Sequence, residues 1–241
     1  MEQLKYLATE LRPTTAIVLF ADNSLAEARS KRILPELNLD LNRQLLRYMT
    51  SSTLEKAHQT SLPVLLINRA QQKGNSFGSR IGSAFKQAFE AGYDNVLMVG
   101  NDCLDLSSDD FTQAAELLNS GKCVLGPDQR GGTWLIGLTK HSFEQLDFAQ
   151  FNWQTARIFN ELNATLGQEN TEELLEKSDL NARHDLKSVI DQLKQGVISQ
   201  LISFIVRLCR PTEYTSQDIE IRRITFVRHL QMRAPPSAFA A

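Results

Sequence analysis

An apolar run that leads directly into an acidic turn constrains this chain more than any other stretch of its sequence. Residues 96–99 read Val-Leu-Met-Val, with Gly92 upstream and Gly100 directly downstream. Apolar residues at successive positions, rather than at alternate ones, are typical of a strand whose two faces are both covered, as in open α/β proteins. The pattern therefore predicts a central strand of an α/β sheet.

The residues that follow this strand are the first candidates for a functional site. Ligands of open α/β sheets bind at the edge formed by the carboxyl ends of the strands, and this strand delivers Asn101, Asp102 and Asp105 to that edge. A carboxylate there is suited to holding a divalent metal ion against phosphate oxygens. The same carboxylates would equally serve as turn and capping residues before a helix that begins near Ser107, so position alone leaves both interpretations open.

The composition excludes several classes of protein. With 241 residues, 42% hydrophobic and 22% charged, the chain suits one α/β domain with an appendage better than two full domains. A net charge of −2 gives no electrostatic reason to expect nucleic acid as a partner. No stretch has the roughly 18 apolar residues of a membrane span and the first residues do not resemble a signal peptide, so we expect a cytoplasmic protein. The three cysteines form no CxxC pair, which implies neither a disulfide framework nor a zinc site.

A second informative stretch, residues 71–80, places glycines around a polar loop. Gly74 and Gly78 bracket this loop, which opens a helix with an apolar stripe. Backbone amides at the start of that helix could hold a phosphate or read a base edge, and Arg80 would add positive charge. Glycine-rich loops are also common connectors, and this spacing matches neither a P-loop nor a dinucleotide-binding fingerprint.

Two further loops could bring charge or backbone flexibility to the predicted edge. Arg32 ends a basic cluster after a predicted first strand at residues 15–21, where it would meet nucleotide phosphates or lie on a solvated helix face. Arg130, Gly131 and Gly132 precede another predicted strand. Paired glycines let a backbone approach a ligand closely, but a hairpin turn needs them equally.

Taken in order, these motifs resemble an uncharacterised family of glycosyltransferase-A-like proteins, which is related to phospholactate guanylyltransferase and other sugar or metabolite nucleotidyltransferases. The resemblance covers roughly residues 14–190, and so many motifs in one order are hard to obtain by chance. The motifs are Gln72-x-Gly74-x-x-Phe77-Gly78-x-Arg80, Gly100-Asn101-Asp102-Cys103-x-Asp105-Leu106, Leu125-Gly126-Pro127, Gly131-Gly132-x-x-Leu135-Ile136-Gly137-Leu138 and Trp153-x-Thr155.

The resemblance implies a fold, a cofactor and a ligand. The fold would be that of the nucleotide-diphospho-sugar transferases, a three-layer α/β/α sandwich with a mostly parallel central sheet, formed by a nucleotide-binding domain of residues 1–195. Residues 196–241 lie beyond the resemblance, and their own pattern, an apolar helical stretch followed by a polar end, predicts a C-terminal helical extension with a disordered tail. Asp102, and with it Asp179, would hold Mg²⁺ or Mn²⁺ against the phosphates of a nucleotide.

The chain also departs from the family's pattern at three places. The family's first loop carries a glycine and several basic residues, of which only Arg32 remains in register, with Lys31 beside it. Arg130 stands where the family places a carboxylate, and Asn181 stands where it places a second aspartate. If that aspartate holds the metal in relatives, its loss should lower the affinity for the ion, because a carboxylate supplies most of the attraction for a hard cation. Arg130 could compensate by binding phosphate itself.

Two hypotheses of function follow. In the first, the protein is a metal-dependent transferase with a nucleotide or nucleotide-sugar donor and an unknown small-molecule acceptor; Asp102 and Asp179 hold the metal, and arginines neutralise phosphate charge. The sequence does not distinguish nucleotidyl from glycosyl transfer. In the second, the protein is a binding or regulatory scaffold that keeps the fold and has lost turnover. The survival of the Asp102 strand and of both glycine loops favours the transferase. The residues expected to contact the nucleotide or its phosphates are Arg32, Gly74, Gly78, Arg80, Asn101, Arg130, Gly131 and Gly132.

Overall fold

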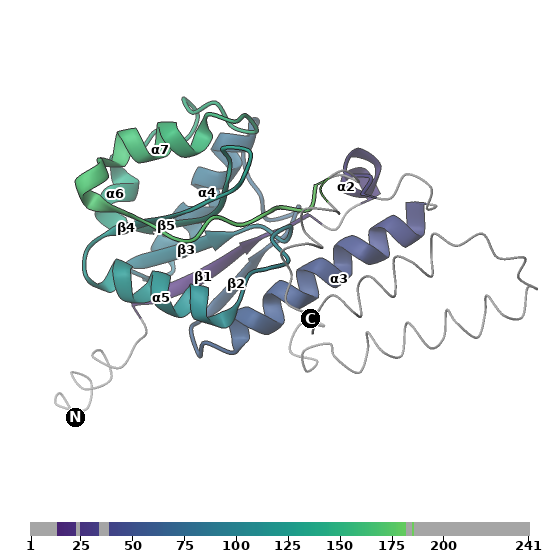
Figure 1. The fold of residues 1–241 in the computed structure, drawn as a ribbon, viewed down its shortest axis with the longest axis horizontal. Coiled ribbons are helices and arrows are strands. Elements are labelled where there is room, and N and C mark those ends of the chain that lie inside the picture. The colour runs from purple at the N-terminus through teal and green to yellow at the C-terminus, as the bar shows by residue number, and fades with distance from the viewer. Residues whose placement is uncertain (1–13, 23–24, 34–38, 182–184, 186–241) are drawn as a thin grey trace, which may run out of the picture.

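The computed structural model describes residues 14–22, 25–33, 39–181 and 185, and in them six strands form one sheet (Figure 1). The strands are β1 (Thr15–Phe20), β2 (Val64–Ile67), β3 (Asn95–Val99), β4 (Cys123–Pro127), β5 (Thr133–Thr139) and β6 (Thr171–Glu173). The helices are α2 (Leu25–Ser30), α3 (Leu39–His58), α4 (Phe77–Glu90), α5 (Ser108–Asn119), α6 (Lys140–Glu144), α7 (Ile158–Leu166) and the 3-10 helix η1 (Gln168–Asn170). None of these helices combines the length and the apolar character that crossing a bilayer requires. The predicted extension of residues 196–241 lies outside the described residues, so the division into domains stays a prediction.

The sheet has the order β2-β1-β3-β5-β4-β6, and of these strands β5 alone runs against the others. The reversal has a local cause, because the short loop of residues 128–132 joins β4 to β5, and a loop of this length can connect only antiparallel neighbours. The other strands point the same way, which confirms the prediction of a mostly parallel sheet. The carboxyl ends of β1, β3 and β4 therefore share one edge, and the loop between β4 and β5 lies at that edge too.

Helices cover both faces of the sheet, with α3 and α5 on one side and α4, α6 and α7 on the other (Figure 1). Side chains of β3 alternate between the two faces. Leu97 and Val99 pack in the core beneath α3 and α5, whereas Val96 and Met98 pack beneath α4. This confirms the three-layer sandwich, and it explains why β3 is apolar at every position from 96 to 99.

A third apolar cluster joins α2 and α3 to the residues that follow β3. Ile33 after α2 and Leu46 of α3 are fully buried in it. Leu104, from the turn after β3, and Leu180, from a segment much later in the chain, pack in the same cluster. The cluster therefore fixes α2 close to the acidic turn.

We expect Phe85→Ala to lower the free energy of unfolding by about 3–5 kcal/mol. Phe85 is fully buried on α4, and its ring centroid lies 6.3, 6.0 and 5.5 Å from those of Phe89, Phe143 and Phe148, so truncation would leave a cavity. Urea unfolding followed by circular dichroism measures the change. Leu175→Ala is the control: its side chain is 82% exposed, and its loss should change stability by less than about 0.5 kcal/mol. Equal effects of the two variants would contradict this packing.

Candidate functional site

Two lysines donate hydrogen bonds to backbone carbonyl oxygens of the acidic turn, which comprises residues 101–106. Lys56 of α3 donates from Nζ to the carbonyl oxygen of Leu104 at 2.8 Å, and burial lowers the pKa of this lysine. Lys177 donates to the carbonyl oxygen of Asp105 at 3.1 Å and lies 3.1 Å from Oδ2 of Asp110, which also caps α5 through Ser107. The side chain of Asp105 lies 3.6 Å from the same ammonium group. Asp105 thus serves the turn itself, as the structural interpretation of this motif expected.

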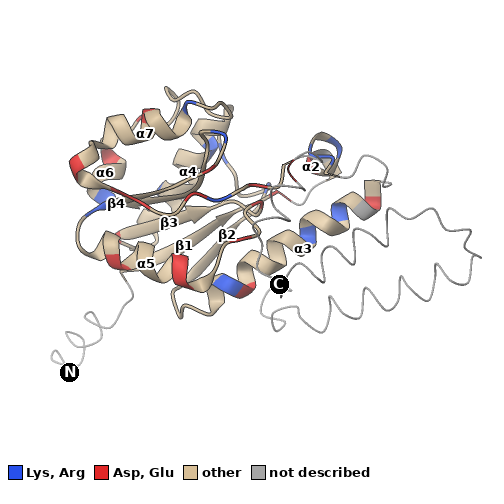
Figure 2. Ribbon diagram, in the orientation of Figure 1, with Lys and Arg blue, Asp and Glu red and all other residues tan. Residues whose placement is uncertain are grey.

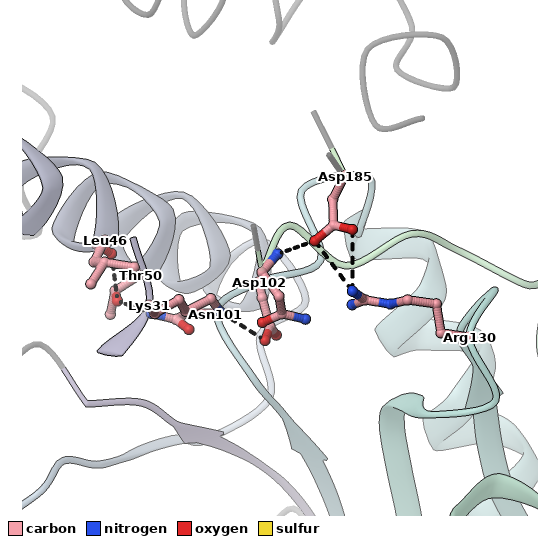
Figure 3. Close-up of polar contacts among 8 residues, drawn as sticks. Lys31, Leu46, Thr50, Asn101, Asp102, Arg130 and Asp185 are labelled. Carbon is pink, nitrogen blue, oxygen red and sulfur yellow. Dashed lines mark hydrogen bonds and ion pairs between the residues drawn. The ribbon is translucent and has the colours of Figure 1, made fainter. Parts of the chain in front are cut away.

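Asn101 connects the turn to α3. Its amide donates to Oγ1 of Thr50 at 2.9 Å, and the Thr50 hydroxyl donates to the carbonyl oxygen of Leu46 at 3.0 Å (Figure 3). Asn101 is only 4% exposed. Its place is explained by this chain of hydrogen bonds, and its predicted contact with a nucleotide stays a prediction.

Asp102 and Asp179 come together because the segment around Asp179 runs back along the turn. The backbone N–H of Leu180 donates to the carbonyl oxygen of Asp102 at 2.9 Å, and Asp179 forms an isolated antiparallel bridge with Cys103. Burial raises the pKa of Asp179 well above its ordinary value, and the negative charges of Asp102 and Asp128 raise it further. The two metal ligands expected from the sequence are therefore electrostatic neighbours. Burial also raises the pKa of the Cys103 thiol, which argues against a thiolate nucleophile here.

This carboxylate pair fits a divalent cation. Among the described residues, Oδ1 of Asp179 is buried and has no hydrogen-bond partner, an arrangement that costs free energy unless a cation or proton compensates it. Magnesium is commonly held by one or two carboxylates, with substrate phosphates and water as the other ligands. No group of three or more His, Cys, Asp or Glu side chains gathers within reach of one ion in the described part of the chain. The pair would therefore need ligand oxygens to complete the coordination.

The two positive side chains nearest this pair approach Asp102 from opposite sides, as Figure 3 shows for Lys31 and Arg130. Nζ of Lys31 lies 3.0 Å from Oδ2 of Asp102. Nη1 of Arg130 lies 3.1 Å from Oδ1 of Asp185, a buried carboxylate that also accepts the backbone N–H of Asn181 at 2.8 Å. The positive charges of Lys31 and Arg130 lower the pKa of Asp179, so they partly offset the effects of burial and of the neighbouring carboxylates.

The loop between β4 and β5 is organised by Asp128. Oδ1 of this buried residue accepts the backbone N–H groups of Arg130, at 2.5 Å, and of Gly132, at 3.1 Å. Gly131 has a φ of +79°, and a β-carbon there would collide with the carbonyl oxygen of Ala156. A β-carbon at Gly132 would collide with the Asp128 carboxylate. The tight turn therefore explains both glycines, and their approach to a ligand stays a prediction.

The earlier glycine loop is likewise shaped by contacts within the chain. Gly74 has a φ of +130°. A β-carbon on Gly78 would collide with the carbonyl oxygen of Phe148 and the indole of Trp153, so glycine lets the start of α4 pack against these groups. Ser76 and Ser79 form a capping box that satisfies backbone donors at the helix start. The connector interpretation of this loop is sufficient to explain its sequence, and phosphate binding there stays a prediction.

Arg80 belongs to a different group from Asp102. Its guanidinium lies 5.6 Å from the centroid of the Phe77 ring, and its Nη1 lies 3.5 Å from Oε1 of Gln72. Burial and the charge of Arg69 lower the pKa of Arg80, and Nε of Arg69 lies 3.8 Å from Asp22. Arg69 and Asp22 follow β2 and β1, whereas Asp102 follows β3 and Arg130 follows β4.

Arg32 is exposed just after α2, beside Lys31. Sequence reasoning selected Arg32 from this basic cluster, but the residue that contacts Asp102 is Lys31. Glu27 was missed as well: it lies four positions before Lys31, a spacing that puts both side chains on one face of a helix. Asp185 was expected with Asp179 as a carboxylate that could reach the cleft, whereas Asp128 carried no signal beyond its proximity to Gly131 and Gly132.

Residues 40–155 match the model of a family described as an uncharacterized protein conserved in bacteria (DUF2064). The expected resemblance to an uncharacterised family is confirmed. The sequence matches no curated protein.

Solved structures confirm the expected fold. A protein from Desulfovibrio desulfuricans G20, named as a candidate nucleotide-diphospho-sugar transferase, superposes with a TM-score of 0.68 at 18% identity, over 81% of this chain and 96% of that one. The 4-diphosphocytidyl-2C-methyl-D-erythritol synthase of Anaerococcus prevotii DSM 20548 superposes with a TM-score of 0.45 at 10% identity, over 76% of this chain and 100% of that one. The first of these shows that the chain has the nucleotide-diphospho-sugar transferase fold.

We expect Glu27→Gln to reduce the loss of stability that accompanies a rise in pH from about 4.5 to about 7. Burial raises the pKa of Glu27 from 4.5 to about 7, Asp22 and Asp102 add to the rise, and Lys31 opposes it. Because the folded pKa is raised, the contribution of this carboxyl to stability is complete below pH 4.5 and is lost as the pH rises through about 7. Glutamine cannot ionise, so the variant lacks this loss.

Thermal unfolding of both proteins at a series of pH values, in the presence of a chelator, measures the difference. As the pH rises from about 4.5 to about 7, the Tm of the variant should increase relative to that of the wild type. At pH 4 the carboxyl is protonated in both folded and unfolded chains, so that pH serves as the internal control. Parallel pH profiles would contradict the placement of Glu27.

Proposed function

We propose that this protein is a metal-dependent transferase that takes a nucleotide or nucleotide-sugar donor and transfers its nucleotidyl or glycosyl group to a small acceptor. The observation that carries the proposal is the pair Asp102 and Asp179 at the carboxyl edge of the sheet, with one buried oxygen of Asp179 left without a hydrogen-bond partner in the described residues. Phosphate groups together with a divalent cation would satisfy both the carboxylates and the flanking cations. The fold shared with the Desulfovibrio protein is consistent with this function but does not by itself establish it.

The carboxylates would bind the cofactor, and the arginines would bind the donor. Asp102 and Asp179 would hold Mg²⁺ or Mn²⁺, which supplies Lewis-acid polarisation of the donor's phosphate oxygens. Arg130 is 46% exposed at its side chain, so its guanidinium can exchange Asp185 for a phosphate, which it would contact through two parallel N–H groups. Arg80 and Arg69 extend the positive charge along the ends of β1 and β2. These cations would neutralise the charge that develops on a transferring phosphate.

A transferase also needs a general base to activate the acceptor, and the described residues offer one candidate for this role. Glu27 carries a carboxyl whose pKa of about 7 suits a general base at neutral pH. The choice between attack at phosphorus and attack at an anomeric carbon depends on the acceptor. The proposal therefore names a donor class and leaves the acceptor to experiment.

A scaffold without turnover remains the second candidate, and one observation favours it. Lys31 pairs with Asp102 and Arg130 pairs with Asp185, so these charges are satisfied within the chain without a ligand. A scaffold would retain these pairs permanently, whereas a transferase must open them when the donor binds. The two candidates therefore differ in whether metal and donor bind at Asp102.

We expect a nucleotide or nucleotide sugar to raise the Tm only in the presence of Mg²⁺ or Mn²⁺, and we expect this metal-dependent rise to vanish in Asp102→Asn and in Asp179→Asn. Both changes remove a charged metal ligand at nearly constant side-chain volume. A ligand at one hundred times its Kd stabilises the folded state by about 2.7 kcal/mol, which a thermal-shift screen detects readily. Donors that shift the Tm are then incubated with mixed acceptors, and products are identified by mass spectrometry.

Glu90→Gln is the matched control, because it also removes one carboxylate. Glu90 forms an exposed ion pair with Lys86 on α4, at 3.7 Å, and it precedes β3, whereas the acidic turn follows that strand. This variant should retain the full metal-dependent shift. A shift that persists in both aspartate variants would contradict the site, and a metal-dependent shift without any product would favour the scaffold.

A further inference from the structure

The contact between Lys31 and Asp102 is the feature of the site that the proposed function does not use. Nζ of Lys31 lies 3.0 Å from Oδ2 of Asp102, and both side chains are mostly withdrawn from solvent, at 14% and 25% exposure. The ammonium group therefore contacts an oxygen that the proposed function assigns to a metal ion. A monovalent cation supplied by the chain and a divalent cation supplied by solution would compete for the same carboxylate.

The position of Lys31 is fixed by the surrounding backbone. Asn42 of α3 is fully buried, and its amide donates to the carbonyl oxygens of Ala28, at 2.7 Å, and of Lys31, at 2.8 Å. The last carbonyl groups of a helix have no partner within the helix, and here the Asn42 amide supplies one. The N–H of Lys31 donates in turn to the carbonyl oxygen of Glu27 at 2.7 Å. Because the backbone of Lys31 is held by these hydrogen bonds, the position of its side chain is restricted, and Nζ contacts Asp102.

The positive charge of Lys31 compensates the negative charges of the carboxyl groups around it. Lys31 opposes the burial-driven rise in the pKa of Glu27 and of Asp179, so one ammonium group acts on three carboxyls, including Asp102. Without that charge, Asp102 would face Asp179 with no compensating group on this side. Like charges that are partly buried and close together are strongly unfavourable.

We propose that Lys31 is a built-in counter-ion of Asp102, which a divalent metal displaces and which then binds a phosphate of the donor. The inference rests on the proposed function, because it assumes that Asp102 is a metal ligand. Lys31 thereby lowers the affinity of the empty site for free metal and raises its affinity for anions. It makes the site selective for a donor that brings metal and phosphate together.

Replacement of Lys31 should change the two affinities in opposite directions. In Lys31→Met, Mn²⁺ has no ammonium group to displace, and its affinity should rise about tenfold, within the usual range for coupling between two ligands. Inorganic pyrophosphate, measured with a chelator and without metal, would face an Asp102 whose negative charge is no longer compensated, and its affinity should fall about tenfold. A purely structural role for Lys31 would lower both affinities, so the opposite signs identify the counter-ion.

The experiment measures Mn²⁺ binding by electron paramagnetic resonance and metal-free pyrophosphate binding by calorimetry on the full chain. The variants are Lys31→Met and Lys31→Gln, and the second keeps a polar side chain in case the first fails to fold. Lys86→Met is the matched control, since it removes an exposed lysine that forms an ion pair with Glu90 on α4. Circular dichroism confirms that each protein is folded.

The outcomes separate this inference from the proposed function. Unchanged or weaker Mn²⁺ binding in a folded Lys31 variant overturns the inference, while metal-dependent donor binding by the wild type would leave the proposed function standing. Mn²⁺ binding that emerges only in the Lys31 variants supports the inference, and metal-dependent donor binding by the wild type then tests the proposed function separately. Failure of wild type and variants alike to bind Mn²⁺ overturns the inference together with the metal-dependent part of the proposed function.

Discussion

Hydrogen bonds from a buried lysine, Lys177, and a half-buried one, Lys56, to the backbone of the acidic turn are the interaction on which the candidate site depends. Lys56 and Lys177 come from segments far apart in the chain, and both donate to backbone carbonyl oxygens of the turn after β3. Lys177 also neutralises Asp105 and Asp110, so these carboxylates are committed to the fold. Buried ion pairs of this kind stabilise little by themselves, but removal of one partner leaves an uncompensated charge and is costly. Asp105 therefore contacts Lys177, whereas Asp102, in the same turn, contacts Lys31 and is the carboxylate left for the candidate site.

The charges at that edge form pairs that a ligand would have to rearrange. Figure 2 shows that positively and negatively charged residues are interspersed along the described ribbon. Lys31, directly after α2, forms an ion pair with Asp102, and Asp185 forms one with Arg130. Among the described residues, one buried oxygen of Asp179 has no hydrogen-bond partner. A divalent cation alone would have to break the first pair, and an anion alone would have to break either pair. A metal and a phosphate that arrive together satisfy all of these groups, which is why a nucleotide donor suits the edge better than either ion alone.

The sequence was sufficient for the parts of this structure that depend on local pattern. Four successive apolar residues identified β3, and the position after that strand placed Asp102 at the carboxyl edge of the sheet. The pattern could not separate Asp102 from Asp105, because their different roles are decided by Lys177, which lies 72 positions after Asp105. Asn101 was assigned to a nucleotide for the same reason, since its partner Thr50 is 51 positions away. The glycines at 78, 131 and 132 were recognised as special, but the groups that require them lie on Phe148, Ala156 and Asp128, and only the folded chain brings these together.

The departures from the family's pattern are connected in the folded chain. Arg130 and Asn181 each replace a carboxylate by a residue without negative charge, and considered separately both should weaken a metal site. In the structure they meet at Asp185, whose carboxylate contacts the Arg130 guanidinium and accepts the backbone N–H of Asn181. The side chain at position 181 takes no part in that contact, so the position of Asp185 does not depend on a carboxylate there. The substitutions therefore leave Asp102 and Asp179 in place and make their surroundings more positive. An edge of this charge should bind a bare divalent cation weakly and a polyphosphate strongly, so that the donor, rather than the protein, supplies most of the ligands for the metal.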